Sequence, residues 1–245
     1  DDAFKECSIE KTIWLTNTPP SGYKNLSSKV HYVANNQYTS LSNVTVYPYL
    51  SSMFEVGGIK YVPVRPSERT CDAIDCAYDS TSVNININNT VSFKGIDMTV
   101  KDIKPYTCYS NKNIKSVKLN YNGNVGGYAF YGCSALKTLT VNANNIGEYA
   151  FSESATMNLA TFDVKAKTLG DYSFKGCTKV ESITLSDDLT SIGKNAFENC
   201  SNLETMVIPN TVTSMGGYLF SGCSSLENVT VGTGVKAINQ YAFLG

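Results

Sequence analysis

Apolar and polar residues alternate over short stretches along most of this chain, and one such stretch returns at a nearly constant interval. The interval is clearest in residues 178–200 and 201–223, which align position by position over 23 residues. Phenylalanine keeps the same step at Phe174, Phe197, Phe220 and Phe243. A fixed period of this size predicts a solenoid in which each repeat forms one coil.

Each repeat shows the same succession of local signals. An apolar–polar–apolar triplet predicts a strand with its apolar side chains in the core, and a short second extended piece follows, as in residues 189–192. A Gly or Asn then turns the chain, and the block Tyr/Asn-Ala-Phe-x-x-Cys is expected to form one helical or 3₁₀ turn that buries its Phe. The predicted strand triplets contain Val117/Leu119, Leu139/Val141, Phe162/Val164, Ile183/Leu185, Met206/Ile208 and Val229/Val231.

The pattern divides the chain into three parts. Residues 112–245 form the regular array. Residues 54–111 combine a β-hairpin around Gly57-Gly58, a loop at residues 67–80 and a degenerate first coil with an insertion near Lys94-Gly95. Residues 1–53 are interpreted as a degenerate terminal coil or cap of a preceding repeat segment, with short strands in residues 9–17 and 29–41. Because the chain begins and ends inside repeat-like segments, we expect it to be a piece of a longer protein.

Composition argues against several classes of function. The net charge is −1, so no strong field favours nucleic acid or an anionic membrane surface. No run of 18 apolar residues occurs, so the sequence predicts no membrane-spanning helix. Charged residues make up only 17% of the chain, while Asn, Ser, Thr and Tyr are abundant, which favours a surface that bonds through hydroxyls and amides.

Five of the eight cysteines follow a Phe by three residues and so occupy one position of the repeat. A cysteine at a core position is most simply a small apolar group, so we expect free, buried thiols there, with a disulfide between stacked coils as the alternative. These cysteines are Cys7, Cys133, Cys177, Cys200 and Cys223. Cys71 and Cys76 lie outside the repeat; a local bridge between them is one hypothesis, and the pairing of Cys108 stays open.

The sequence offers little material for catalysis. His31 is the only histidine, which leaves little scope for a Ser-His-Asp set or a His-based metal centre. A pair of His31 with Cys71 or Cys76 is the remaining alternative to a histidine in a terminal loop. Asp187-Asp188 lacks the Gly and the distal Glu of a calcium loop and is expected to be a solvated turn. We therefore expect no enzyme activity, no cofactor and no metal.

The repeat resembles the BspA-type, or Treponema pallidum-type, leucine-rich repeat, whose pattern is L-x-x-[IVM]-x-[IL]-P-x-x-V-x-x-[IM]-G-x-x-[AL]-F-x-x-C. The resemblance is strong over residues 112–245 and weaker over 54–111; Ser154 in place of Cys and the segment 165–167 depart from the pattern. It implies an α/β, β-rich leucine-rich-repeat solenoid with coils of about 23 residues. The matching residues of one unit are Leu203, Met206, Ile208, Pro209, Val212, Met215, Gly216, Phe220 and Cys223.

The resemblance also implies a function. Such proteins are surface-exposed or secreted, and some act as adhesins for host matrix proteins or other microbes. We expect a non-enzymatic binding module whose partner is a host matrix or bacterial surface protein, with a glycan ligand or a passive spacer role as alternatives. The expected contact residues point outward from the main strands, where an ordinary solvated face is the competing interpretation: Lys118, Thr138, Thr140, Thr161, Asp163, Ser182, Thr184, Thr205, Val207, Asn228 and Thr230.

A recurring tyrosine precedes the Phe block. It forms either a second contact stripe, which would suit a carbohydrate ligand, or a cover over the edge of the core, and the second interpretation is favoured. The tyrosines concerned are Tyr121, Tyr128, Tyr149, Tyr172, Tyr218 and Tyr241.

Overall fold

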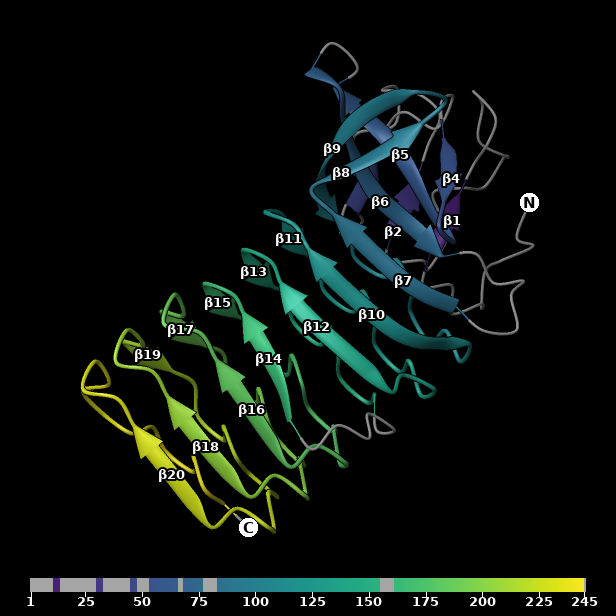
Figure 1. Cartoon of the computed structure of the whole chain (residues 1–245). Helices are drawn as coiled ribbons and strands as arrows, with labels where there is room; N and C mark the ends of the chain where they lie inside the picture. The colour runs from purple at the N-terminus through teal and green to yellow at the C-terminus, as the bar shows by residue number, and fades with distance from the viewer. Residues whose placement is uncertain are drawn as a thin grey trace.

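The computed structural model describes residues 11–13, 30–32, 45–47, 53–65, 68–76, 83–154 and 161–244. From residue 83 onward the chain winds into stacked coils, which Figure 1 shows as a row from teal to yellow. One sheet of the stack has the strand order β20-β18-β16-β14-β12-β10-β7, and the other has the order β19-β17-β15-β13-β11-β9-β6-β5-β4. The described ranges contain no α-helix, so the solenoid is built from strands and turns.

The seven-stranded sheet takes one strand from each coil. All its neighbouring strands are parallel, and equivalent repeat positions are partners, as in Val117↔Leu139 and Ile183↔Met206. The strands coincide with the predicted triplets, which confirms that part of the pattern. They are β7 (Val83–Asn88), β10 (Ile114–Asn120), β12 (Thr138–Asn142), β14 (Thr161–Lys165), β16 (Ser182–Leu185), β18 (Thr205–Ile208) and β20 (Asn228–Val231).

The second extended piece of each coil forms a narrow parallel ladder on the other sheet. Its strands are only two residues long after the first coil, and each contributes one buried apolar residue, such as Ile192. They are β9 (Ile96–Ile103), β11 (Asn124–Val125), β13 (Asn145–Ile146), β15 (Thr168–Leu169), β17 (Ser191–Ile192) and β19 (Ser214–Met215).

Antiparallel strands close the N-terminal side of this ladder. β4 (Phe54–Val56) and β5 (Ile59–Arg65) form the predicted hairpin, with Gly57 and Gly58 at φ 59° and 77°. Glycine suits this turn because it adopts positive φ without strain. The predicted insertion is a second hairpin, in which β8 (Thr90–Phe93) and β9 are joined at Lys94-Gly95.

The prediction of a loop at residues 67–80 was wrong, because β6 (Thr70–Cys76) runs through it as a wholly buried strand. It pairs with β5 on one side and β9 on the other. The strand was missed because both of its faces are covered, so it shows no alternation of exposed and buried positions. Its two carboxylates are buried with lysine partners, Asp72 with Lys104 at 2.8 Å and Asp75 with Lys60 at 3.3 Å.

Three short strands are described nearer the N-terminus, namely β1 (Lys11–Ile13), β2 (Val30–Tyr32) and β3 (Thr45–Tyr47). They form a parallel sheet in the order β1-β2-β3. β1 and β2 fall within the segments predicted as strands, and β2 contains His31. The rest of residues 1–52 lies outside the described residues, so their assignment to a terminal coil stays a prediction.

The block around each Phe forms successive turns with i→i+3 hydrogen bonds, which are bonds of the 3₁₀ type, and it does not continue into a helix. In one coil the Ala150 N–H donates to the Gly147 carbonyl at 3.3 Å, and the Ser152 N–H donates to the Tyr149 carbonyl at 3.2 Å. Tyr149 has φ 52°, which stops helical propagation. The intervening Phe151 N–H donates instead to the Ser173 carbonyl of the next coil at 2.8 Å, so this edge of the stack is also a ladder.

The phenylalanines form one internal column, as predicted. Successive ring centroids from Phe130 through Phe151, Phe174 and Phe197 to Phe220 lie 5.2, 5.4, 6.0 and 5.8 Å apart. The rings are nearly parallel, with interplanar angles of at most 13°. Because each ring from Phe151 to Phe220 lies between two others, burial and stacking act together along this part of the column.

The free thiols predicted at the repeat position are confirmed for Cys133, Cys177 and Cys200, which are buried, whereas Cys223 is only partly buried. Cys7 lies outside the described residues. Each of these four thiols donates to a carbonyl of the preceding coil, as from Cys200 to Phe174 at 3.3 Å. Ser154 makes the equivalent bond to the Phe130 carbonyl at 3.2 Å, so the serine replaces the donor that the thiol supplies elsewhere.

The proposed Cys71–Cys76 bridge is wrong, because Cys76 is bonded to Cys108 and Cys71 is free and buried. Both Cys71 and Cys76 lie in β6, where five residues of extended chain span about 16 Å. A disulfide requires Cα atoms within about 7 Å, whereas those of Cys76 and Cys108 are 5.1 Å apart. Cys108 occupies the position that Phe130 holds in the next coil, so the bridge begins the internal column.

We predict that Phe197→Ala lowers the free energy of unfolding by about 3–5 kcal/mol, because it removes a fully buried ring between two others. Chemical denaturation measures the change. Thr205→Ala, at an exposed position of β18, is the control and should change stability by less than about 0.5 kcal/mol. Equal losses in the two variants would contradict the column as a source of stability.

We also predict that Cys76→Ala with Cys108→Ala lowers stability by about 2–4 kcal/mol, because the bridge closes a loop of 32 residues between β6 and the first coil. Thermal melts under non-reducing conditions measure it. Reducing agent should shift the melt of the unmodified chain and leave that of the double variant in place. A reductant effect of the same size on both proteins would assign the effect to another source.

Candidate interaction surface

The expected contact residues lie on the outer face of the seven-stranded sheet. All whose side chains are described are exposed except Ser182, which is half-buried. Thr161 is on β14, and its side chain lies outside the description. Inward neighbours such as Ile183 and Met206 are 4% and 2% exposed, and only on the last strand, β20, are they partly exposed. The period-two pattern of the strands therefore separates a packed face from a solvent-facing one.

Strand pairing arranges these residues in two rows across the coils. One row contains the register partners Ser182↔Thr205 and Thr205↔Asn228. The other contains Lys118↔Thr140, Asp163↔Thr184 and Val207↔Thr230. Because the backbone ladder fixes the register, the rows present hydroxyl and amide groups at a regular spacing of about 4.8 Å.

The sequence-based set missed residues of the same face in the first coils. Asn84 and Asn86 on β7 are exposed, and the Ser116 hydroxyl donates to the Asn84 Oδ1 at 2.7 Å. On the next strands, the Asn142 Nδ2 donates to the Asn120 Oδ1 at 2.9 Å. The alternation at residues 83–88 is the signal for Asn84 and Asn86, and it is weaker than in later coils because the first coil departs from the repeat pattern.

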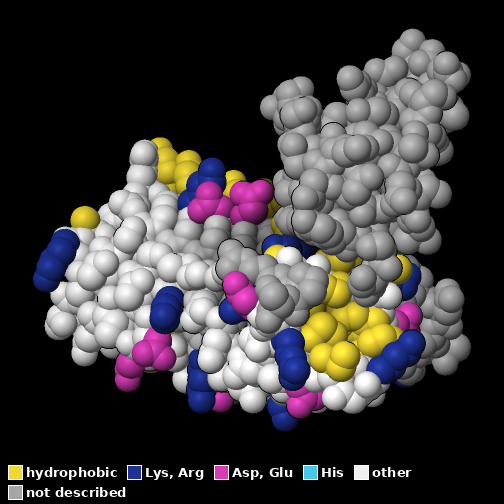
Figure 2. All heavy atoms as spheres, turned by 90° about the horizontal axis from the view of Figure 1, so that it is seen from above, with side chains coloured by type: hydrophobic (Ala, Val, Ile, Leu, Met, Phe, Trp, Pro, Cys, Tyr) yellow, Lys and Arg dark blue, Asp and Glu magenta, His cyan; other side chains and the backbone are white. Residues whose placement is uncertain are grey.

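The face has little charge and one exposed apolar side chain. Lys118 and Asp163 are the charged members of the expected set, and Val207 is 59% exposed. Figure 2 views the molecule at 90° to Figure 1 and therefore shows an adjoining side, where basic and acidic side chains are also interspersed over the described part. Recognition by this sheet would therefore depend on shape and hydrogen bonding more than on long-range attraction.

The tyrosines form a ladder parallel to the phenylalanine column. Tyr106, Tyr128, Tyr149 and Tyr172 stack in turn with centroids 5.1, 4.7 and 4.5 Å apart and interplanar angles of 8°, 14° and 10°. Asn195 occupies the position in the next coil, and the ladder resumes with Tyr218 and Tyr241 at 5.0 Å. Tyr121 is separate, because it is fully buried and donates to the Asn124 carbonyl.

Each tyrosine of this ladder has a left-handed backbone, with φ between 52° and 61°. That conformation costs a residue with a side chain roughly 1–2 kcal/mol, and Gly or Asn would adopt it more easily. Stacking of about 0.5–1.5 kcal/mol per pair offsets this cost where the rings meet face to face. The structure thus supports a stabilising cover over the edge of the core for these tyrosines.

Stacking also removes the surface that a sugar would use. Carbohydrate rings pack against aromatic faces, but both faces of Tyr128 and Tyr149 are covered by neighbouring tyrosines. One face of Tyr172 meets Tyr149, and the ammonium groups of Lys175 and Lys194 lie 5.4 and 5.7 Å from its centroid. From Tyr128 to Tyr172 the stripe therefore offers no open ring face, and this part does not support the tyrosine-based carbohydrate hypothesis, whereas Tyr218 and Tyr241 are 39% and 47% exposed.

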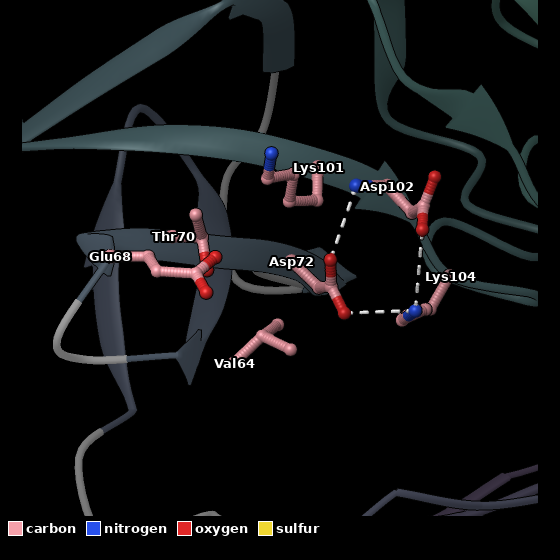
Figure 3. A pocket seen from close by; sticks show the side chains of 7 residues that line it. All are labelled: Val64, Glu68, Thr70, Asp72, Lys101, Asp102 and Lys104. Atoms are coloured by element: carbon pink, nitrogen blue, oxygen red, sulfur yellow. Dashed lines mark hydrogen bonds and ion pairs between the residues drawn. The ribbon is translucent and has the colours of Figure 1, made fainter.

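A cleft of about 310 Å³ lies beside β6 and β9, and Figure 3 shows its lining. Lys104 Nζ lies 2.8 Å from the Asp72 carboxylate and 3.6 Å from that of Asp102. The Asp102 N–H donates to Asp72 Oδ1 at 3.1 Å, and Asn124 donates its N–H and Nδ2 to Asp102 Oδ1. Burial raises the pKa of Asp72, and Lys104 opposes this shift.

This network engages all four carboxylate oxygens of Asp72 and Asp102 with partners from the chain itself. It joins β6 to β9 and to the first regular coil through Asn124. Because its acidic groups are already bonded within the chain, we interpret the cleft as a contact that stabilises the packing of β6 on β9 and the first regular coil, and not as a ligand site.

The cysteines do not provide a nucleophile in the described part of the chain. Burial raises the pKa of Cys71 to about 12, so its thiolate is scarce at neutral pH. Cys76 is in the disulfide, which leaves neither partner for the Cys–His alternative. The described residues contain no group of three His, Cys, Asp or Glu side chains placed to hold a metal ion.

Within the same residues, no helix has the length and apolar character needed to cross a membrane.

The coil geometry, with a parallel strand and an internal Phe rung in each repeat, defines a leucine-rich-repeat solenoid. Residues 78–158 and 144–245 match the family described as the BspA type leucine rich repeat region, in six copies. These matches cover more than half of the chain, so the chain belongs to this family. Proteins of the family are generally binding modules and not enzymes. No curated protein matches the chain.

Solved structures with the same fold come from several bacteria. The pneumococcal vaccine antigen PcpA is 20% identical with a TM-score of 0.56 and covers 75% of this chain and 50% of its own. A leucine-rich repeat protein from Bacteroides ovatus is 19% identical with a TM-score of 0.54 and covers 74% and 54%. A leucine rich cell surface protein from Faecalibacterium prausnitzii is 20% identical with a TM-score of 0.47 and covers 76% and 55%. The chain thus spans about half the length of each.

We predict that Tyr149→Asn lowers the free energy of unfolding by about 1–2 kcal/mol, because it removes a ring that stacks on two others. Asn tolerates the left-handed backbone, as Asn195 does, so the change tests the ring and not the turn. Tyr218→Asn is the matched control, since Tyr218 has one tilted neighbour and should lose less than half as much. A larger loss at Tyr218 would contradict the stacking argument.

Proposed function

We propose that this chain is a non-enzymatic binding module of a bacterial cell surface or secreted protein. In this proposal the outer face of the seven-stranded sheet contacts a protein of the host matrix or of another bacterial surface. The observation that carries it is the pair of registered rows of short polar side chains on a sheet whose opposite face is a continuous core.

The character of the face supports a protein partner. Thr and Ser side chains lose little conformational entropy when they become ordered in an interface. Val207 adds an exposed apolar group among these hydroxyls, because its strand β18 lies between β16, which carries Thr184, and β20, which carries Thr230. A small apolar contact surrounded by hydrogen-bonding groups is the usual composition of protein interfaces.

Two observations support the location. The solved relatives include a cell surface protein and a vaccine antigen. The Cys76–Cys108 disulfide fits an oxidising, extracellular environment, because disulfides are rare where thiols are kept reduced.

The test is a binding assay of the immobilised chain against purified host matrix proteins and surface extracts of other bacteria. For a partner so identified, Thr184→Lys and Val207→Lys should each weaken binding about tenfold or more, because the long charged side chain prevents close approach of the two surfaces. Melting temperatures should stay unchanged, since both positions are exposed.

Asn202→Lys is the matched control, because it places the same side chain at an exposed turn position away from the sheet. It should bind as the unmodified chain does. Equal affinity of the face variants and the unmodified chain would overturn the proposal, as would an equal loss in the control. Absence of any protein partner would favour the passive spacer.

A further inference from the structure

A groove of about 170 Å³ lies where β12 and β14 end, at the corner between the two sheets. Its polar lining consists of Asn122, Asn142, Asn144, Lys165, Lys167 and Asp188, and its other lining residues are alanines. It is smaller than the roughly 300–1,000 Å³ of sites for drug-sized ligands. One sugar ring or one small anionic group would therefore fill it.

The strand register brings two of these residues together from different coils. Lys165 ends β14 and is the partner of Asn142, which ends β12. Lys167 follows the buried Ala166 at the bend between β14 and β15, and it is exposed, as Lys165 is. The two lysines belong to the segment that departs from the repeat pattern, and packing does not require them, since both are exposed.

The backbone of the corner is fixed before any ligand arrives. The Ala143 N–H donates to the Lys165 carbonyl at 3.0 Å, and the Lys167 N–H donates to the Asn144 carbonyl at 2.7 Å. Asn144 also donates its N–H to the Gly123 carbonyl at 2.8 Å and its Nδ2 to the Asn122 carbonyl. A site built on such paired backbone loses little entropy when it binds.

The groove is lined by two lysines and one aspartate, an excess of positive charge in a chain whose net charge is −1. In the part of the chain that the structure describes, no ion pair engages Lys165, Lys167 or Asp188. The ammonium groups are therefore available to an anionic group of a ligand.

We propose that this groove binds a uronic acid residue of an acidic polysaccharide. The sugar carboxylate would lie between Lys165 and Lys167, and its hydroxyls would meet the Asn amides, which both donate and accept. Asp188 would accept from a hydroxyl, a role that excludes ligands with no donor. An acidic peptide or a free sulfate offers anionic groups but lacks hydroxyls beside them, so the sugar acid fits the whole lining best.

This inference adds a second ligand to the proposed binding module. It depends on the proposed function only in assuming that the chain recognises ligands through its surface. The probes are oligosaccharides of galacturonate, of mannuronate and of alternating glucuronate and N-acetylglucosamine, with maltohexaose as the neutral control and hexaglutamate as the acidic peptide. Isothermal titration at about 0.15 M salt measures affinity. At least one uronate oligosaccharide should bind saturably and more tightly than both controls.

The decisive variant is Lys165→Gln with Lys167→Gln, which should weaken uronate binding about tenfold or more, because each lost contact is charge-assisted. The matched control is Lys137→Gln with Lys179→Gln, which removes the same charge from exposed positions outside the groove and should change affinity less than about twofold. Asp188→Asn should weaken uronate binding, although it makes the groove more positive.

Several results would overturn the proposal. These are no saturable binding of any uronate probe, equal losses in the two double variants, tighter uronate binding by Asp188→Asn, or hexaglutamate binding at least as tight. Thr184→Lys and Val207→Lys separate this site from the sheet face. If these two variants lose the protein partner but still bind uronate, the two ligands bind to different surfaces. A negative result in the uronate assay does not affect the proposal of a protein partner, and a negative result in the protein assay does not affect the uronate proposal.

Discussion

Hydrogen bonding between the backbones of successive coils is the constraint on which the rest of this structure depends. Three ladders carry it, along the two sheets and along the turns that hold the phenylalanines. A parallel ladder in fixed register places each residue beside its own equivalent one repeat later. Every position must therefore accept a like neighbour, and the chain meets this condition with columns of Phe, Tyr and Cys inside or at the edge, and with rows of Thr, Ser and Asn outside.

The same constraint makes the ends of the stack special, because an end coil has a neighbour on one side only. At the N-terminal side the antiparallel strands β4 to β6 cover the first coil, the Cys76–Cys108 bridge takes the place of a phenylalanine, and the buried Asp72–Lys104 pair joins cap to coil. At the other end of the described chain, Phe243 still stacks on Phe220 but is 46% exposed. The difference between a ring of the interior and one at an end measures how much burial the next coil supplies.

Recognition depends on positions that packing leaves free. The outward members of the strands can vary without disturbing the core, and the recognition that we propose uses such exposed residues, among them Val207, Lys165 and Lys167. The tyrosines show the opposite case. They resembled a contact stripe in the sequence, but their faces are used within the fold and their strained backbone is offset by stacking.

The sequence by itself determined the coil, its strands, the phenylalanine column and the outward face, because a period of 23 residues relates positions that end up adjacent. It also determined the hairpin at Gly57-Gly58, since that turn is local. Only the tertiary structure decided that β6 is a buried strand and that Cys76 pairs with Cys108. These two features join segments that no period relates, so their proximity follows from the packing of the cap against the first coil and leaves no pattern in the chain.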